Sequence, residues 1–129
     1  MVLVDTTVVI VYLRTRDLRL FSLFQAHTAA VTGIVRAEVL SGVRSPAELL
    51  QTPIVLDTFV QVDFPHTLWD RVGSNRAALR SSGLSVPFND VVLATLAIEL
   101  GVEVWSRDRH FALMQRVLPS LKLFQEPKP

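Results

Sequence analysis

The sequence contains no cysteine among its 129 residues. This absence excludes disulfide bonds, thiolate-bound zinc and iron–sulfur clusters, and it is compatible with a cytoplasmic location. No apolar run approaches the roughly 18 uncharged residues that span a bilayer. The first residues, MVLVDTTVVIVYLRTRD, lack the basic start and the cleavage site of a signal peptide. We therefore expect a cytoplasmic protein without a membrane partner.

Lysine is scarce, since only Lys122 and Lys128 contribute to the 13 cationic residues. The net charge of +1 argues against a protein that binds nucleic acid by bulk electrostatics alone. The other cations are arginines, whose guanidinium groups suit bidentate phosphate contacts, although genomic base bias also produces this composition. Half of the residues are hydrophobic, which is enough for one domain with a continuous core.

Short apolar segments alternate with longer stretches of helical periodicity along the chain. The strand-like segments are residues 1–5, 29–33, 59–64, 102–106 and 121–124, and no hairpin signal joins any two of them. This order predicts an α/β domain of three layers, with a central, mostly parallel β-sheet flanked by helices on both faces. We expect one domain over residues 1–124 and a short flexible C-terminal tail over residues 125–129.

Acidic residues stand where the predicted strands end. Asp5 follows the first strand, and Asp108 lies two residues beyond the strand at 102–106, so both are expected at the sheet edge where active sites collect. Taken singly, each is better explained as an N-cap of the helix that follows. Asp90 opens the apolar helix-like run VVLATLAIEL, where the helix macrodipole also favours a negative charge.

Glu38 lies in the predicted helix GIVRAEVLSGV, which is apolar around most of its circumference. It occupies either a narrow solvent stripe beside Arg36 or a cleft, and the sequence leaves both interpretations open. Four carboxylates in one pocket repel each other unless cations bind there. Oxygen ligands favour Mg²⁺ or Mn²⁺ over zinc.

The three histidines, His27, His66 and His110, show no metal-ligand spacing. We interpret them as surface or cap residues. The sequence also lacks a glycine-rich phosphate loop and a nucleophile elbow of the serine hydrolases.

Four stretches, VDTTVVI, RAEVLSG, FNDVVLATLAIELG and VWSRDRHF, occur in this order. Together they resemble the motifs of PIN-domain ribonucleases, in particular the VapC-type toxins of toxin–antitoxin modules, over residues 1–124. The resemblance implies a PIN-like fold. It also implies a Mg²⁺- or Mn²⁺-dependent endoribonuclease that cleaves RNA phosphodiester bonds with a metal-activated water.

The resemblance implies roles for individual residues. The matching acids are Asp5, Glu38, Asp90 and Asp108 as the catalytic set, of which Asp5, Asp90 and Asp108 are expected to hold the metal. Thr7 and Ser106 match supporting polar positions. His110 stands where many relatives have another aspartate, so a second metal is expected to bind weakly or not at all.

Two further features of the sequence lie outside the matched acids and supporting polar positions. Arg107 and Arg109 flank Asp108, and we expect them near the RNA backbone, with a plain surface role as the alternative. Residues 49–65 match no motif, and their role is open.

The resemblance further implies partners. A VapB-type antitoxin is expected to lay a C-terminal segment with an arginine across the acids, in a groove lined by residues such as 8–13 and 18–24. A homodimer is expected as well, since half the chain is hydrophobic. Two alternatives are a haloacid-dehalogenase-like phosphohydrolase, which needs an aspartate where Thr7 stands, and a non-catalytic PIN-like RNA-binding module, which would not need all four acids.

Overall fold

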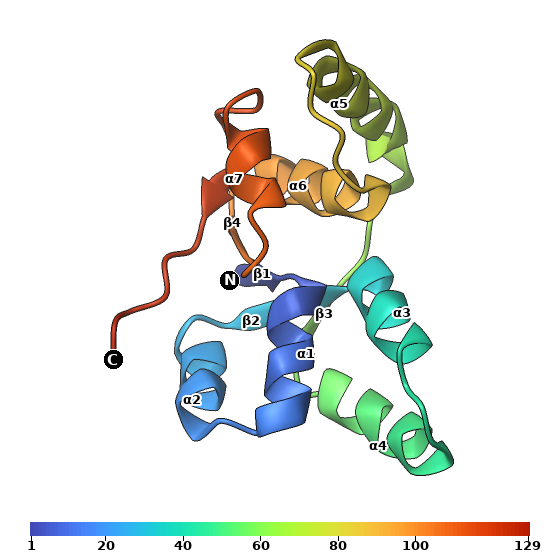
Figure 1. Cartoon of the computed structure of the whole chain (residues 1–129), viewed down its shortest axis with the longest axis vertical. Coiled ribbons are helices and arrows are strands. Elements are labelled where there is room, and N and C mark those ends of the chain that lie inside the picture. Colours follow the sequence, from blue (N-terminus) through green and yellow to red (C-terminus); the bar gives the residue numbers. More distant parts are fainter.

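The computed structural model describes residues 1–129, which form three layers around one β-sheet. The strands are β1 (Val2–Val4), β2 (Ala29–Thr32), β3 (Val60–Val62), β4 (Glu103–Trp105) and β5 (Lys122–Leu123). Their order is β3-β2-β1-β4-β5, and every neighbouring pair is parallel. In Figure 1, α5, α6 and α7 lie on one side of the sheet and α1 to α4 on the other. The α/β architecture predicted from the sequence is confirmed.

Seven α-helices and one short 3-10 helix connect the strands. They are α1 (Thr6–Thr15), α2 (Leu18–Ala26), α3 (Gly33–Ser41), α4 (Pro46–Leu56), η1 (His66–Leu68), α5 (Trp69–Ser81), α6 (Phe88–Leu100) and α7 (His110–Gln115). Side-chain caps start three of them, since the N-cap residues Asp17, Thr32 and Ser45 accept backbone N–H groups of α2, α3 and α4. None of the helices combines the length and the apolar character that crossing a bilayer requires.

Helix α6 explains the unusually apolar run near the C-terminal third of the chain. All seven residues from Val91 to Ala97 are buried, so the helix has no solvent face over this stretch. It packs against β4 on one side and against α5 on the other, where the Asn75 amide donates a hydrogen bond of 3.0 Å to the Thr95 hydroxyl. A helix buried all round needs apolar residues on every face.

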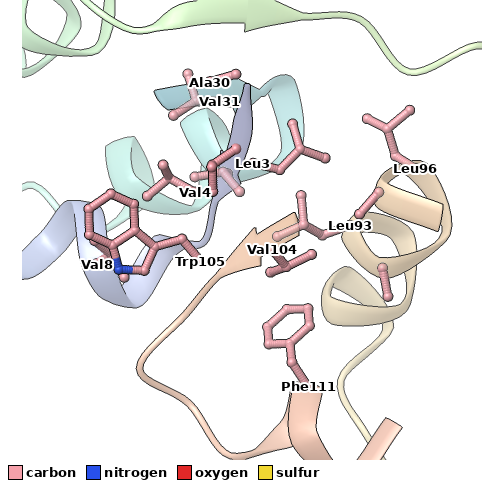
Figure 2. Close-up of a cluster of buried hydrophobic side chains, with 14 of the residues drawn as sticks. Leu3, Val4, Val8, Ala30, Val31, Leu93, Leu96, Val104, Trp105 and Phe111 are labelled. Atoms are coloured by element: carbon pink, nitrogen blue, oxygen red, sulfur yellow. The ribbon is translucent and has the colours of Figure 1, made fainter. Parts of the chain in front are cut away.

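The core lies between the central strands and the helices on both faces. Figure 2 shows Leu3 of β1 and Val104 of β4 on the side of Leu93 of α6, whereas Trp105 of β4 lies on the other side, beside Val8 of α1. Trp105 is fully buried and packs edge-on against Phe24 of α2 at 5.1 Å between ring centroids. The two central strands are therefore covered on both faces. The residues of the candidate site follow the C-terminal ends of these strands.

The strand order creates a topological switch point between β1 and β4. The chain passes from β1 to β2 on one side, and the later strands β4 and β5 add on the other side. The Asp5 amide continues the ladder beyond both strands by donating to the Trp105 carbonyl at 2.8 Å. Asp5 and Ser106 therefore leave the sheet side by side, where ligands bind in open parallel sheets.

Candidate metal centre

Asp5 is a buried carboxylate at the end of β1, with only 4% of its surface exposed. It occupies the N-cap position of α1, but its side chain makes no capping hydrogen bond. Instead its Oδ2 accepts from the Thr7 hydroxyl at 2.9 Å and from the Ser106 hydroxyl at 2.8 Å. The capping role considered from the sequence is wrong for this side chain, because its partners are two hydroxyls on different elements.

The same two hydroxyls also hold the loop that carries Asp108. Thr7 Oγ1 accepts the Arg107 amide at 3.1 Å, and Ser106 Oγ accepts the Asp108 amide at 2.9 Å. Each hydroxyl thus bonds the Asp5 carboxylate and one backbone amide of the loop. The start of α1 and the loop after β4 form one hydrogen-bonded unit, so Asp108 has a fixed position relative to Asp5.

Asp90, Asp108 and His110 form a compact cluster. The Nδ1 atom of His110 lies 3.0 Å from Asp90 Oδ2 and 3.1 Å from Asp108 Oδ2. One potential ligand atom from each residue falls within 4.8 Å of the others. The interpretation of His110 as an ordinary surface or cap residue is therefore wrong, because its imidazole lies between two of the acids.

A local turn brings His110 into this position. The Asp108 Oδ1 atom accepts the His110 amide at 3.0 Å, which is the Asx turn that aspartate commonly makes with the second residue after it. The turn starts α7 and directs the imidazole back toward α6. The only signal in the sequence was the two-residue spacing between Asp108 and His110.

The environment of Asp90 raises the pKa of its carboxyl group from 3.8 to about 6. Burial is the largest cause, and the negative charge of Asp5 is the next. The hydrogen bond from His110 acts in the opposite direction without cancelling these effects, and Asp108 adds a smaller increase. With 13% of its side chain exposed, Asp90 is a carboxylate whose ionisation is unfavourable unless a cation binds beside it.

Glu38 lies at the side of this cluster, half-buried on α3. Its Oε1 accepts the Thr6 hydroxyl at 3.0 Å, which joins Glu38 to the residue that follows Asp5. It does not share the solvent stripe with Arg36, because Arg36 pairs instead with Asp57 at 2.8 Å. Of the two interpretations left open by the sequence, the structure supports a position facing α1. The structure does not bring Glu38 into the compact cluster of possible ligands.

The two arginines beside Asp108 differ in their surroundings. Arg107 forms a bidentate ion pair with Glu126, with Nε 2.9 Å from Oε1 and Nη2 3.1 Å from Oε2. Arg109 is exposed, and both arginines line a cavity of about 310 Å³ together with Asp108. Glu126 belongs to the segment 125–129 that the sequence predicts to be a flexible tail. It is tied to the domain by this ion pair.

The fold agrees with comparisons against known proteins. The sequence profile of the PIN domain matches residues 2–117, which is most of the chain. The protein belongs to the PIN domain family. The resemblance stated from the four motifs is thereby confirmed.

Solved structures with the same fold include several VapBC proteins. The chain is similar to VapBC2 from Rickettsia felis with a TM-score of 0.82 and 20% identity, over 96% of this chain and 98% of that one. For VapBC from Salmonella typhimurium the TM-score is 0.82 and the identity 19%, over 95% and 96% of the two chains. A toxin–antitoxin complex from Klebsiella pneumoniae gives 0.70 and 17%, over 94% and 95%. No curated protein matches the sequence.

Proposed function

We propose that the protein is a Mg²⁺- or Mn²⁺-dependent endoribonuclease that serves as the toxin of a toxin–antitoxin pair in the cytoplasm. The observation that carries this proposal is the compact cluster of Asp90, Asp108 and His110 at the sheet edge. Asp5 lies outside that cluster, but it is near enough for its charge to raise the pKa of Asp90. Membership of the PIN domain family and the fold shared with VapBC structures support it.

The donor set fits a hard divalent cation. Asp5, Asp90 and Asp108 would hold it, since carboxylate oxygens are the ligands that Mg²⁺ and Mn²⁺ prefer. The raised pKa of Asp90 supports this fit, because a cation beside the carboxyl would stabilise its charged form. When bound, the ion supplies an activated water and stabilises charge on the leaving oxygen of a phosphodiester.

The remaining residues prepare the site. Thr7 and Ser106 donate to the same oxygen of Asp5, so the carboxylate is oriented before a cation or substrate arrives. His110 bonds both Asp90 and Asp108, and it would keep their oxygens near each other when no cation is present. Glu38 would orient the attacking water from the α3 side, since the Thr6 hydroxyl holds its carboxylate at the start of α1.

A paired assay tests this proposal and separates it from the two alternatives. The protein is incubated with fluorescent single-stranded RNA and, in parallel, with p-nitrophenyl phosphate, each with Mg²⁺, with Mn²⁺ and with EDTA. We expect RNA cleavage that EDTA abolishes and no release of nitrophenol. Nitrophenol release would support the phosphohydrolase, and RNA binding without cleavage would support the non-catalytic module.

We further propose that an antitoxin segment binds the cavity between α1, α3 and α4. This cavity has a volume of about 590 Å³ and is lined by Ile10 and Leu13 of α1 and by Val39 of α3. Helix α4, which includes residues 49–56 of the region whose role the sequence left open, provides its third wall. Of the residues expected to line the antitoxin groove, Ile10 and Leu13 line this cavity and residues 18–24 do not.

The cavity supports an antitoxin partner because helix α1, which lines it with Ile10 and Leu13, leads back to Asp5. Helix α1 starts beside Asp5, and its 10 residues rise about 15 Å, so a bound peptide can reach from the cavity to the acids. An arginine of that peptide would then pair with the carboxylates. Coexpression with the VapB-type protein encoded beside it tests this proposal by light scattering. Failure to form a complex would contradict the antitoxin proposal and leave the nuclease assay unaffected.

We also propose that the protein forms a homodimer through the surface around Trp69. The Trp69 ring is 46% exposed, although it stacks on Phe64 at 4.4 Å between ring centroids. Beside it lies a cavity of about 210 Å³ with Ile34 and Leu93 in its lining. An exposed indole next to an apolar cavity is typical of a protein–protein interface.

A further inference from the structure

The carboxylate of Glu126 has two partners that differ in kind. Its Oε1 accepts the buried indole N–H of Trp105 at 2.8 Å and the Nε–H of Arg107 at 2.9 Å. Its Oε2 accepts the Arg107 Nη2 group at 3.1 Å. The Trp105 donor needs a partner because the ring is fully buried, whereas the Arg107 side chain is 41% exposed and open to other anions.

The chain after β5 leads Glu126 to this position. The Phe124 amide donates to the Val104 carbonyl at 2.8 Å, which extends the pairing of β4 and β5. The Phe124 ring packs against Trp105 at 4.5 Å between centroids. Beyond Glu126, the guanidinium of Arg19 donates to the Pro127 carbonyl. Figure 1 shows this C-terminal segment running from β5 toward the α2 side of the sheet.

Arg107 belongs to the same hydrogen-bonded unit as the acids. Its amide donates to Thr7 Oγ1, which in turn donates to Asp5 Oδ2. Arg107 also lines one cavity together with Asp108 and Arg109, and we take this cavity as the path of the RNA backbone beside the proposed catalytic centre. A guanidinium pairs with a carboxylate and with a phosphate through the same two-pronged geometry, so the two anions compete for it.

We propose that the Arg107 guanidinium binds a phosphate of the RNA substrate, and that Glu126 pairs with this guanidinium when no RNA is bound. The inference rests on the proposed ribonuclease function. It adds a contact with the substrate and a carboxylate of the same chain that competes for it. A phosphate displaces Glu126 from Arg107, while the Trp105 indole retains its bond to Oε1. The pair lowers RNA affinity by an amount limited to about five-fold, because exposed ion pairs are weak.

The expected behaviour follows from the charges around the pair. Asp17 also faces Arg107, and Arg19 faces Glu126, so removing the Glu126 charge leaves Arg107 with one weaker acidic neighbour. In Glu126→Gln the amide oxygen still accepts from Trp105, while the ion pair is lost. This variant should bind RNA more tightly and with a steeper salt dependence.

The test measures binding of fluorescein-labelled single-stranded RNA across a salt series, with every protein in an Asp5→Asn background that prevents cleavage. Glu126→Gln should bind about three- to five-fold more tightly at low salt. Its slope of log affinity against log salt should steepen by at most roughly 0.7, the value for one phosphate contact on a single strand, because the contact no longer replaces an ion pair within the protein. Glu99→Gln is the matched control, because Glu99 is exposed and makes no ion pair. It should change affinity less than two-fold.

A double variant identifies Arg107 as the group that Glu126 covers. In the Arg107→Gln background, Glu126→Gln should have no effect on affinity or slope. Tighter binding that persists without Arg107, or no change on replacing Glu126 alone, would overturn the inference. Thermal melting checks that Glu126→Gln remains folded. If none of these proteins binds RNA, the proposed function and the inference both fail. If the wild-type protein cleaves RNA but Glu126→Gln leaves the slope of RNA binding unchanged, the inference alone is refuted.

Discussion

Replacing Asp90 by asparagine should make the metal-free protein more stable, and more so at high pH. The pKa of Asp90 in the folded protein is about 6, above the ordinary aspartate value of 3.8. The folded state therefore binds the Asp90 proton more tightly than the unfolded state does. The favourable contribution of the protonated carboxyl is complete below about pH 4 and is lost as the pH rises through 6. Asparagine does not ionise over this interval, so its contribution does not change with pH.

The size of the effect follows from the shift in pKa. A shift of about two units corresponds to at most about 3 kcal/mol at pH 8, at 1.4 kcal/mol per unit. About half of that amount is added between pH 5 and pH 8. This shift already includes the opposing effect of the His110 hydrogen bond. We therefore expect Asp90→Asn to exceed the wild type by up to about 3 kcal/mol at pH 8.

Urea unfolding in EDTA at pH 5 and pH 8, followed by circular dichroism, measures this difference. Titrating groups away from this cluster affect both proteins alike, so the change in the difference between the two pH values reports Asp90 and the groups in contact with it. Addition of Mg²⁺ at pH 8 should stabilise the wild type more than the variant. A difference that does not vary with pH, or a variant less stable than the wild type at pH 8, would refute the electrostatic reasoning.

Three further predictions concern the rim of the site and the subunit interface. His110→Asp should strengthen Mn²⁺ binding several-fold in calorimetry and lower the metal-free melting temperature, because it adds a carboxylate beside Asp90; unchanged affinity would mean that residue 110 does not contact the cation. Arg109→Gln should flatten the salt dependence of RNA binding by roughly 0.7, and an equal slope would place Arg109 away from the backbone. Trp69→Ala should convert a dimer into a monomer in light scattering, while Leu50→Ala, exposed on α4, should not; a dimer that survives the first change would exclude the proposed interface.

The fold was predictable because local and long-range requirements agree along this chain. Strands β1 to β4 are short, mostly apolar runs that end at or just before a polar residue (Asp5, Thr32, Asp63 and Ser106), and the segments between the strands are too long for hairpins. The buried helix α6 stands out, since only a helix covered on all sides tolerates the run from Val91 to Ala97. The motifs did not reach helix α4, which continues through Pro53 to Leu56, whose burial stabilises the last turn.

The candidate site was predictable where strand ends define it and not where turns and tertiary pairing do. Asp5 and Asp108 follow parallel strands, so their common edge could be inferred from order alone. The position of His110 depends on an Asx turn that no periodicity reveals. The pairing of Arg107 with Glu126 depends on the register of β5 against β4, which the sequence does not specify.

The central claim is that Asp5 and its acidic neighbours form a divalent-cation centre that cleaves RNA. It is tested most directly by the rate of cleavage of an end-labelled RNA against Mg²⁺ concentration, for the wild type and for Asp5→Asn. We expect the wild-type rate to rise with Mg²⁺ to a plateau, and the variant to lose at least about 100-fold at every concentration while keeping its circular dichroism spectrum. Cleavage by Asp5→Asn at the wild-type rate, or a wild-type rate unaffected by EDTA, would contradict the account.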